Sequence, residues 1–554
     1  MSSTHEVSNQ VPPLVDFDTA DHPALLAGLR REGAGWAVDD VSAIGRLAGS
    51  AQAQEWGRLA ELHHPVLRTH DRWGNRVDEV EYDPAYHELM RVAVANGLHA
   101  TSWADDRPGA HVARAAKMLA WGQADAGHIC PISMTYAVVP ALRNQPDLAA
   151  AFEPLLASTD YDFGLRAPAT KRGLIAGMSM TEKQGGSDVR ANTTTATPND
   201  DGTFRIVGHK WFTSAPMSDF FLTLAQAPGG LSCFLLPRVL PDGTRNPIRI
   251  QRLKDKLGNR SNASAEIEYD DAVGWLVGEQ GRGVRTIIDM VNMTRLDCVL
   301  GTTGGMLTGL RTAMHHATHR SAFGAKLVDQ PAMVNVLADL AVETEAALTV
   351  AMRLAGAVDR VSRGDEQEAL FRRLGLAVTK YWVCKRGPAH AAEALECLGG
   401  NGYVEESGMP KLYREMPLLS IWEGSGNVAA LDALRAMATA PMAVEAVFAE
   451  LDAAHGADDR LDQAVITLRK ELGDLDDIQY RARRLVEQMA LCLQGALLVR
   501  HGDPAVADAF CASRLGGDWG GAFGTLPRGI DTERILARAY AGGPTNSNSR
   551  TSGS

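Results

Sequence analysis

"TFRIVGHKWFTSAPMSDFFLTLAQAPGGLSCFLLPRVLPDGT", residues 203–244, is the stretch that decides the fold. Its β-branched and aromatic runs are broken by Gly, Pro, Asp and Asn, which is typical of short strands joined by turns. The same pattern extends from about residue 172 to 285. The sequence therefore predicts a β domain in the middle of the chain.

Helical patterns flank this β domain on both sides. Apolar residues recur at spacings of three and four in segments such as "HVARAAKMLAWGQADAG" before it and "QPAMVNVLADLAVETEAALTVAMRLAGAVDRVSRG" after it, where Gly364 is a natural helix C-cap. The fold class predicted is mainly α with a central β domain. The expected parts are an extended N-terminal arm (1–38), a helical N-terminal domain (39–171), the β domain (172–285), a helical bundle (286–440), a helical C-terminal domain (441–540) and a disordered tail (541–554).

Composition excludes several classes of protein. The chain has 554 residues, 45% of them hydrophobic, which is enough for several packed domains. Its net charge of -12 argues against a surface that attracts nucleic acid everywhere, although a local basic strip stays open. The seven cysteines are scattered without a C-x-x-C pair, which indicates reduced thiols in the cytoplasm. No signal peptide is visible and the apolar runs are too short to span a membrane.

The segment "GMSMTEKQGGSDVRANTT" (177–194) is the densest candidate for ligand binding. Its two adjacent glycines permit close approach of the backbone to a ligand, and the hydroxyls of Thr181 and Ser187 could hold an anion or a polar ring edge. Read alone, the segment is as well explained by a surface turn before the first strand.

Two further glycine-containing motifs have a similar double interpretation. "HRSAFGAKLVDQP" (319–331) combines Arg320, Phe323 and Gln330, which suits pyrophosphate or adenosine contact as well as it suits a solvated helix end. "ECLGGNGYVEES" (396–407) lacks the G-x-G-x-x-G spacing, so a Rossmann dinucleotide site is disfavoured and a helix C-cap is the simple alternative.

Two charged motifs complete the inventory. "HHATH" (315–319) places two histidines four residues apart but lacks the glutamate of a zincin helix, so we expect no metal site. "YRARRLVEQ" (480–488) is a basic cluster in a C-terminal segment that carries more acidic than basic residues. A solvated helix face is favoured there over a phosphate-binding strip made by Arg481, Arg483 and Arg484.

The stretch "SIWEGSGN" (420–427) raises a different question, because Glu423 lies between a tryptophan and a Gly-Ser-Gly-Asn turn. Neither a packed core nor a solvated helix face obviously requires a carboxylate at that place.

Taken together, these motifs resemble the acyl-CoA dehydrogenase superfamily, most closely its AidB-like branch of flavoproteins linked to the alkylation response. The resemblance covers nearly the whole chain to about residue 540. It is carried by "MTEKQGGSD", "GHKWF", "GGLSCFLLPR", "RLKDKLGNRSNAS", "GWLVGE", "MTRLDC", "LGGNGY", "LYREMP" and "IWEGSGN". It implies a helical N-terminal domain, a β-barrel-like middle domain, a helical bundle and an extra helical C-terminal domain.

The resemblance also implies an FAD site built from several segments. In the middle domain, Met180, Thr181 and Ser187 would lie beside the isoalloxazine ring, Phe212 would flank it, and Ser214 would hydrogen-bond flavin N5.

Further FAD contacts are implied for the helical bundle. Arg320, Phe323 and Gln330 would reach the FAD of a neighbouring subunit, as expected in a homotetramer built as a dimer of dimers. Gly399 and Gly400 would lie beside the pyrophosphate of FAD, although Glu396 replaces the glutamine usual in the family.

Glu423 occupies the position of the family's catalytic base, and Gly424, Ser425 and Asn427 match the FAD-contacting turn that follows it. A carboxylate in a dry pocket has a raised pKa and can remove an acidified α-proton as a hydride leaves Cβ. The other position that carries the base in some family members is Thr294 here, which leaves Glu423 as the candidate.

Three functions stay open from the sequence. The first is FAD-dependent α,β-dehydrogenation of an acyl-CoA-like thioester, with electrons passed to an electron-transfer flavoprotein. The second is a flavoprotein that binds and protects double-stranded DNA with vestigial enzymatic activity. The third is a flavin enzyme of a specialised pathway that acts on a carrier-bound substrate.

Overall fold

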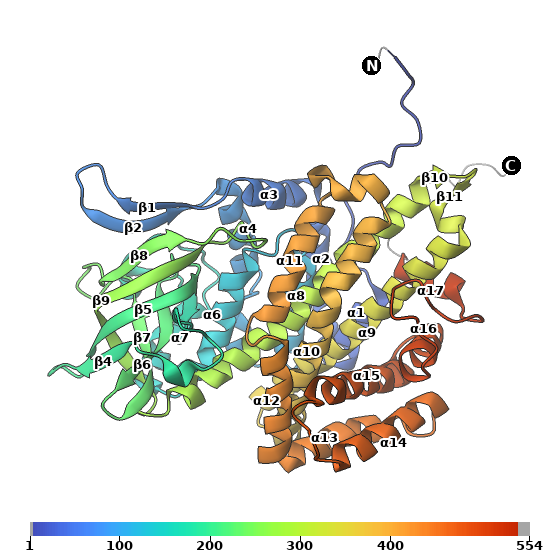
Figure 1. Cartoon of the computed structure of the whole chain (residues 1–554). Helices are drawn as coiled ribbons and strands as arrows, with labels where there is room; N and C mark the ends of the chain where they lie inside the picture. Colours follow the sequence, from blue (N-terminus) through green and yellow to red (C-terminus); the bar gives the residue numbers. More distant parts are fainter. Residues whose placement is uncertain (1–3, 541–554) are drawn as a thin grey trace. The chain divides into compact units, whose positions relative to one another are not determined.

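The computed structural model describes residues 4–540, so the predicted disordered tail lies outside the described residues. The chain forms two compact units (Figure 1). The helical unit comprises Met1–Ala51, His111–Gln123 and Cys298–Ser554, and the barrel unit comprises Gln52–Ala110 and Ala124–Asp297.

The β domain predicted from the sequence is the core of the barrel unit. Its strands are β3 (Ala176–Ser179), β4 (Thr195–Pro198), β5 (Phe204–Ser214), β6 (Phe220–Ala227), β7 (Gly230–Pro237), β8 (Ile248–Leu253) and β9 (Ser264–Val277). The order β3-β6-β4-β5-β9-β7 closes on itself because β6 also pairs with β7, while β8 pairs with β9. Inward residues such as Phe204, Ile206 and Phe234 fill the interior.

The register of β5 against β9 explains how the "GHKWF" motif is displayed. Residues alternate between buried and exposed along the first part of β5, and the register then shifts between Lys210 and Thr213. Both of these residues are buried, so the two residues between them face outward together. The irregularity therefore places Trp211 and Phe212 side by side on the outside of the barrel.

Helices and one hairpin complete the barrel unit: α3 (Ala51–Leu62), β1 (Val66–His70), β2 (Arg76–Glu81), α4 (Pro84–Ala95), α6 (Ile129–Leu142) and α7 (Pro146–Leu156). The β1–β2 hairpin corrects the prediction that residues 39–171 are helical. Asp71 explains the difference, because its carboxylate accepts the N–H groups of Trp73 and Asn75 and Gly74 takes a φ of 87°. This side-chain-stabilised turn competes successfully with helix.

The helical unit contains α1 (Pro23–Arg31), α2 (Val38–Ala48), α5 (Ala110–Trp121), most of α8 (Gly283–His319), α9 (Pro331–Ser362), α10 (Glu366–Glu396), α11 (Met409–Ile421) and α12 (Gly426–Thr439). The C-terminal helices follow as α13 (Pro441–Asp452), α14 (Asp459–Gly473), α15 (Ala482–His501), α16 (Pro504–Phe510) and α17 (Thr532–Ala539). Gly364 has a φ of 90° directly after α9, which confirms the C-cap predicted there.

Helix α1 lies inside the segment predicted to be an extended arm, and this prediction was wrong for residues 23–31. Pro23 occupies the first helical position and the imidazole of His22 accepts the N–H of Ala24. Leu25 and Leu29 are buried, so one face of the short helix is held by packing. A proline start, a side-chain cap and an apolar face together make nine residues helical.

The fold class is confirmed: a mainly helical chain with a β barrel in the middle. All seven cysteines are free and buried, as expected for reduced thiols. Within residues 4–540, none of the helices is both long and apolar enough to cross a bilayer.

Candidate functional site

The loop that follows β3 is organised around Glu182. This carboxylate is fully buried and accepts the N–H groups of Thr193 and Thr194, both of their hydroxyls, and the side-chain amide of Gln184. Burial alone would raise the pKa of Glu182, but these hydrogen bonds and the ammonium of Lys210 hold it well below its usual range. The loop is therefore fixed by an ionised side chain at its centre.

Lys210 is the counter-charge of Glu182. Its Nζ lies 2.9 Å from Glu182 Oε1 and also donates to the carbonyl of Leu224, and both side chains of the ion pair are fully buried. Burial lowers the pKa of Lys210, while Glu182 favours its charged form. Because Lys210 belongs to β5, the pair fastens the loop to the strand that carries "GHKWF".

Met180 and Thr181 are tied to the same framework through their backbones. The carbonyl of Met180 accepts a hydrogen bond from Asn192 Nδ2, and that of Thr181 accepts the N–H of Trp211 at 2.8 Å. A Cβ on Gly186 would lie 2.4 Å from Thr181 Oγ1, so a larger residue at this position would displace the Thr181 side chain. Ser187 lies on the exposed part of the loop.

The end of β5 displays Phe212 and Ser214. Phe212 is 51% exposed, and the ammonium of Lys254 lies 4.6 Å from its ring and 3.4 Å from the ring of Trp211. Ser214 Oγ lies 3.2 Å from Ser264 Oγ on β9. The next residue, Ala215, has a φ of 48°, a left-handed conformation that is strained for alanine.

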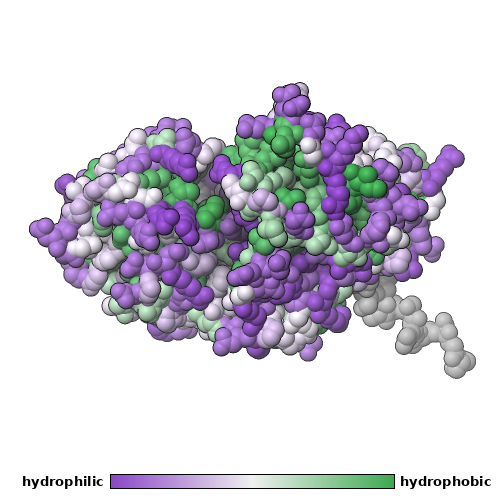
Figure 2. All heavy atoms as spheres, turned by 90° about the horizontal axis from the view of Figure 1, so that it is seen from below, coloured by the Kyte–Doolittle hydropathy of each residue, from purple (hydrophilic) through white to green (hydrophobic). Residues whose placement is uncertain are grey.

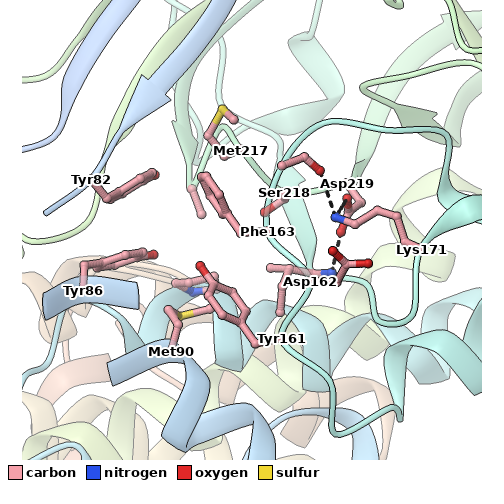
Figure 3. Close-up of a pocket in the computed structure, with 14 residues that line it drawn as sticks. Tyr82, Tyr86, Met90, Tyr161, Asp162, Phe163, Lys171, Met217, Ser218 and Asp219 are labelled. Atoms are coloured by element: carbon pink, nitrogen blue, oxygen red, sulfur yellow. Dashed lines mark hydrogen bonds and ion pairs between the residues drawn. The ribbon is translucent and has the colours of Figure 1, made fainter. Parts of the chain in front are cut away.

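A small aromatic cavity lies beside this strained residue (Figure 3). Tyr82, Tyr86, Tyr161 and Phe163 form much of its wall, and the hydroxyl of Ser218 lies at its edge without a hydrogen-bond partner among the described residues. The cavity measures about 20 Å³, which is room for one water molecule. It is therefore too small to hold an organic ligand.

In the helical unit, Glu423 lies in the turn between α11 and α12. Its φ is 58° and that of Gly424 is 109°, so two consecutive residues are left-handed. The ammonium of Lys380 donates to the carbonyls of Ser420 and Gly424 on either side of the glutamate. Sequence reasoning missed Lys380, a cation that is 1% exposed on the long helix α10; a lysine within the largely apolar stretch "LAVTKYWVC" was the available signal.

The residues after Glu423 begin helix α12. Ser425 is the N-cap residue, but its hydroxyl makes no capping bond, and Asn427 accepts a hydrogen bond from Arg483 Nε at 2.8 Å. The predicted FAD turn and one of the predicted DNA contacts thus meet in one hydrogen bond.

The other two arginines of the predicted DNA strip differ from each other. Arg481 is engaged by Glu471 at 3.0 Å and by the backbone carbonyls of Asp474 and Asp476. Arg484 is exposed. The three arginines therefore do not form a uniform strip of available cations.

Gly399 and Gly400 lie at the start of a short 3-10 helix, Gly399–Tyr403, directly beyond α10. Gly399 has a φ of 59°, and a Cβ built on either glycine would meet only open space within 4 Å. At Gly402, by contrast, a Cβ would lie 2.1 Å from the carbonyl oxygen of Leu395, so glycine is required there for packing. The first two glycines therefore leave their backbone accessible.

Arg320, Phe323 and Gln330 surround a small hairpin of β10 (Ser321–Ala322) and β11 (Ala325–Lys326) after α8. Phe323 at the tip is fully exposed and has a φ of 52°. Gln330 Nε2 donates to the carbonyl of Ala322 at 2.9 Å. The structure brings these three residues together on one protruding feature.

The histidines of "HHATH" serve the fold. The rings of His315 and His319 lie 4.4 Å apart, and His315 Nε2 lies 2.8 Å from the carbonyl of Pro12. Among residues 4–540, no group of three or more His, Cys, Asp or Glu side chains is placed to hold a metal ion.

These residues fall into two groups, one in each unit. The order of the chain, helices followed by a β barrel and then by further helices, is that of the acyl-CoA dehydrogenase fold. Three family models match consecutive parts of the chain. They are the Adaptive response protein AidB N-terminal domain over residues 9–163, the Acyl-CoA dehydrogenase middle domain over 177–272 and the Acyl-CoA dehydrogenase C-terminal domain over 281–438.

The chain is 46% identical to AidB of Escherichia coli (strain K12) over 518 residues, which is 92% of this chain and 94% of the relative. It is 33% identical to acyl-CoA dehydrogenase family member 11 of Caenorhabditis elegans, over 70% of this chain and 64% of that one. The chain therefore belongs to the acyl-CoA dehydrogenase family, in its AidB-like branch, and is an FAD-dependent oxidoreductase of the kind that acts on CH–CH groups.

Solved structures agree with this assignment. The crystal structure of Caenorhabditis elegans ACDH-11 in complex with C11-CoA has a TM-score of 0.83 at 28% identity, and covers 97% of this chain and 93% of its own. The apo form of Bd2924 has a TM-score of 0.82 at 28% identity, with 90% and 100% coverage.

Each unit, taken by itself, has groups that suit a part of FAD. The accessible backbone of Gly399 and Gly400, and the N-terminus of α12 with its unbonded N-cap hydroxyl, provide N–H groups suited to phosphate oxygens. Arg320 supplies a cation with several donors, and Met180, Thr181 and Ser214 supply a fixed polar edge in the barrel unit.

Proposed function

We propose that the chain catalyses α,β-dehydrogenation of an acyl-CoA thioester with Glu423 as the base. The observation that carries the proposal is the backbone of Glu423, whose left-handed φ of 58° is unfavourable for a glutamate. Such strain is retained most readily where the position of a side chain matters for function. Lys380 stabilises the same turn, because its ammonium donates a hydrogen bond to the carbonyl of Gly424.

In this proposal the carboxylate of Glu423 accepts the α-proton of the acyl group while the bond from Cβ to its hydrogen breaks. FAD, when bound, would supply the two-electron acceptor for the hydride that leaves Cβ. Ser214 is assigned to orient that end of the ring, and the Glu182–Lys210 pair to fix the loop beside it. As the external electron acceptor we propose an electron-transfer flavoprotein.

Replacement of Glu423 by glutamine tests the assignment. Glutamine keeps size and hydrogen bonding but cannot accept the proton, so FAD should stay bound while substrate-dependent flavin reduction falls by about 10² to 10⁴-fold. Ser425→Ala is the matched control: it should weaken FAD retention with a smaller effect on the chemical step. The measurement is single-turnover flavin bleaching with short and branched acyl-CoAs and with carrier-bound thioesters. An unchanged rate in Glu423→Gln would remove the residue from the mechanism.

We also propose a homotetramer, because Arg320, Phe323 and Gln330 are assigned to a neighbour's FAD. Apolar surface supports this: Tyr413, Ile421 and Leu431 on α11 and α12 are all more than 40% exposed, and Figure 2 shows hydrophobic residues gathered at the surface of one face. Sedimentation should give a tetramer, and a monomer that retains FAD would contradict the assignment.

Binding of double-stranded DNA stays a prediction from the resemblance. Of its three arginines, Arg481 is engaged by Glu471 and Arg483 by Asn427 of the proposed FAD turn, so the exposed Arg484 is the residue to replace in a salt-dependent gel shift.

A further inference from the structure

The N-terminal arm contacts the hairpin that carries Arg320. We propose that Asn9 is a positioning residue, which holds the β10–β11 hairpin so that Arg320 is presented to the pyrophosphate of FAD. This inference rests on the proposed function, because that function assigns Arg320 to FAD. It adds a role for a segment of the chain that none of the motifs had marked.

Asn9 pairs with Ser321 through both ends of its side-chain amide. Its Oδ1 accepts the N–H of Ser321 at 2.9 Å, and its Nδ2 donates to the carbonyl of Ser321 at 2.8 Å. The amide therefore satisfies both backbone groups of one residue, as a neighbouring strand would. Ser321 is the first residue of β10, so the contact is made at the root of the hairpin.

The hairpin needs this support. Its two strands contain two residues each, too few to be stable by themselves, and its tip residue Phe323 is fully exposed. Other contacts on the hairpin come from neighbouring residues: Gln330 holds Ala322, and Lys326 Nζ donates to the carbonyl of His319. Asn9 is the contact that comes from more than 300 positions away in the sequence.

Arg320 itself also contacts Asn9. One of its terminal nitrogens, Nη1, donates to the backbone carbonyl of Asn9. An arginine has five N–H donors, so this bond fixes the direction of the guanidinium and leaves donors for an anion. The contact uses the backbone of Asn9, whereas the contact to Ser321 uses its side chain, so the two can be separated by mutation.

The conformation of Asn9 fits this role. Its φ is 54°, in the left-handed region that asparagine tolerates better than most residues. Three residues further on, the carbonyl of Pro12 lies 2.8 Å from His315 Nε2 on α8. The arm is therefore anchored along the last turns of α8, and the match to the AidB N-terminal domain begins at residue 9. The arrangement belongs to the part of the chain that is characteristic of this branch.

Asn9→Gly is the decisive variant, because glycine adopts the left-handed backbone without strain and removes only the side-chain contacts. Asp16→Gly is its control: Asp16 lies in the same arm with a φ of 57°, but it contacts Gly49 through its backbone and Ala51 through its carboxylate. Two readouts are needed, hydrogen exchange of the peptide 319–326 by mass spectrometry and the rate of FAD release by flavin fluorescence.

We expect Asn9→Gly to speed exchange in 319–326 and to release FAD about tenfold faster, as the loss of two hydrogen bonds allows. Asp16→Gly should leave both unchanged. Arg320→Ala should release FAD faster by itself, and adding Asn9→Gly to it should have little further effect, because a positioning residue acts through the residue it positions.

The outcomes separate the two assignments. If exchange in 319–326 is unchanged in Asn9→Gly, or if it rises while FAD release matches the wild type, the role of Asn9 is wrong and the dehydrogenase proposal stands. Additive effects of Asn9→Gly and Arg320→Ala also overturn it. A wild-type protein that holds no FAD after reconstitution overturns both.

Discussion

At the scale of single residues, buried charges organise the candidate site. Glu182 and Lys210 are paired at 2.9 Å with both side chains fully buried, and they join the loop after β3 to β5. A buried pair gains little net stability over an apolar pair of the same size, but the loss of one partner leaves an uncompensated charge. The pair therefore specifies one arrangement of the loop that carries Met180 and Thr181.

Glu182→Gln is expected to destabilise the protein by about 3–5 kcal/mol, because the ammonium of Lys210 stays buried without its counter-charge. FAD should also be lost more readily, since the loop loses its central acceptor. The double variant Glu182→Gln/Lys210→Met should recover part of this stability. Urea unfolding and flavin fluorescence measure the two effects, and a single variant within about 1 kcal/mol of the wild type would argue against the role of the pair.

Sequence motifs point to exposed and turn residues of the candidate site more readily than to its buried ones. Glu423, Ser425 and the glycines were assigned from "IWEGSGN" and "LGGNGY", in which a turn pattern surrounds a reactive group. Glu182 and Lys210 belong to the motifs "MTEKQGGSD" and "GHKWF", yet the burial of a charged residue cannot be predicted from its residue type. Asn9 could not have been found, because its partner lies more than 300 residues away.

At the scale of elements, the strands β3–β9 and the long helices α8–α10 follow the patterns that predicted them. The elements that the sequence patterns did not predict are short and depend on specific side-chain caps or turns. Helix α1 depends on His22 and Pro23, and the β1–β2 hairpin on the carboxylate of Asp71. Such elements are set by one or two side-chain bonds, which periodicity over a long window does not detect.

The C-terminal elements provide a prediction at this scale. Arg514 follows α16 and is fully buried against Asp339 and Glu343 of α9, and Asp339 also accepts the N–H of Gly524. Arg514→Met leaves the buried Asp339 without this cation and takes from Glu343 one of its two arginines, the other being Arg386 at 3.3 Å. We expect a loss of about 3–5 kcal/mol and faster proteolysis between residues 516 and 531.

Arg534→Met is the matched control in the same segment. Its ion pair with Asp503 measures 2.9 Å, but the arginine side chain is 54% exposed, so the loss should stay below about 1 kcal/mol. Equal effects of the two variants would show that the buried cluster does not hold the C-terminal segment.

At the scale of the whole molecule, the chain divides differently from the predicted series of domains. The helical segment before the barrel is shared: residues 52–110 belong to the barrel unit, whereas 111–123 belong to the helical unit. Sequence patterns report what each segment forms, but the partner against which it packs depends on long-range contacts. Domain boundaries drawn along the chain could therefore not anticipate a unit made of three separate segments.

Between pH 4 and 6.5 the helical unit should be the more acid-sensitive of the two, although burial also lowers the pKa of His87 in the barrel unit. Burial lowers the pKa of His22 to about 3 and that of His390 to about 4, and burial also lowers the pKa of His315, His316 and His501. Folded His390 therefore binds fewer protons than unfolded histidine between pH 4 and 6.5. The contribution of the buried neutral imidazole to the free energy of unfolding is fully present above pH 6.5. It is lost as the pH falls through this window, at up to about 1.4 kcal/mol per pH unit for each group.

His390→Gln isolates one of these groups. The imidazole lies 2.9 Å from Thr344 Oγ1 and 3.2 Å from the carbonyl of Leu340, and glutamine can make similar bonds without titrating. Between pH 6.5 and 5, the unfolding free energy of His390→Gln should fall less steeply than that of the wild type, by up to about 1.4 kcal/mol per pH unit.

In the barrel unit, burial raises the pKa of Asp219 to about 6. Folded Asp219 therefore binds more protons than unfolded aspartate below this pH, so its contribution favours the folded form at low pH, opposite to that of the histidines. Urea unfolding at several pH values would measure how the free energy of unfolding depends on pH, and hydrogen exchange would separate the helical unit from the barrel unit. If the unfolding free energy of His390→Gln fell as steeply with pH as that of the wild type, His390 would not be a source of the acid sensitivity.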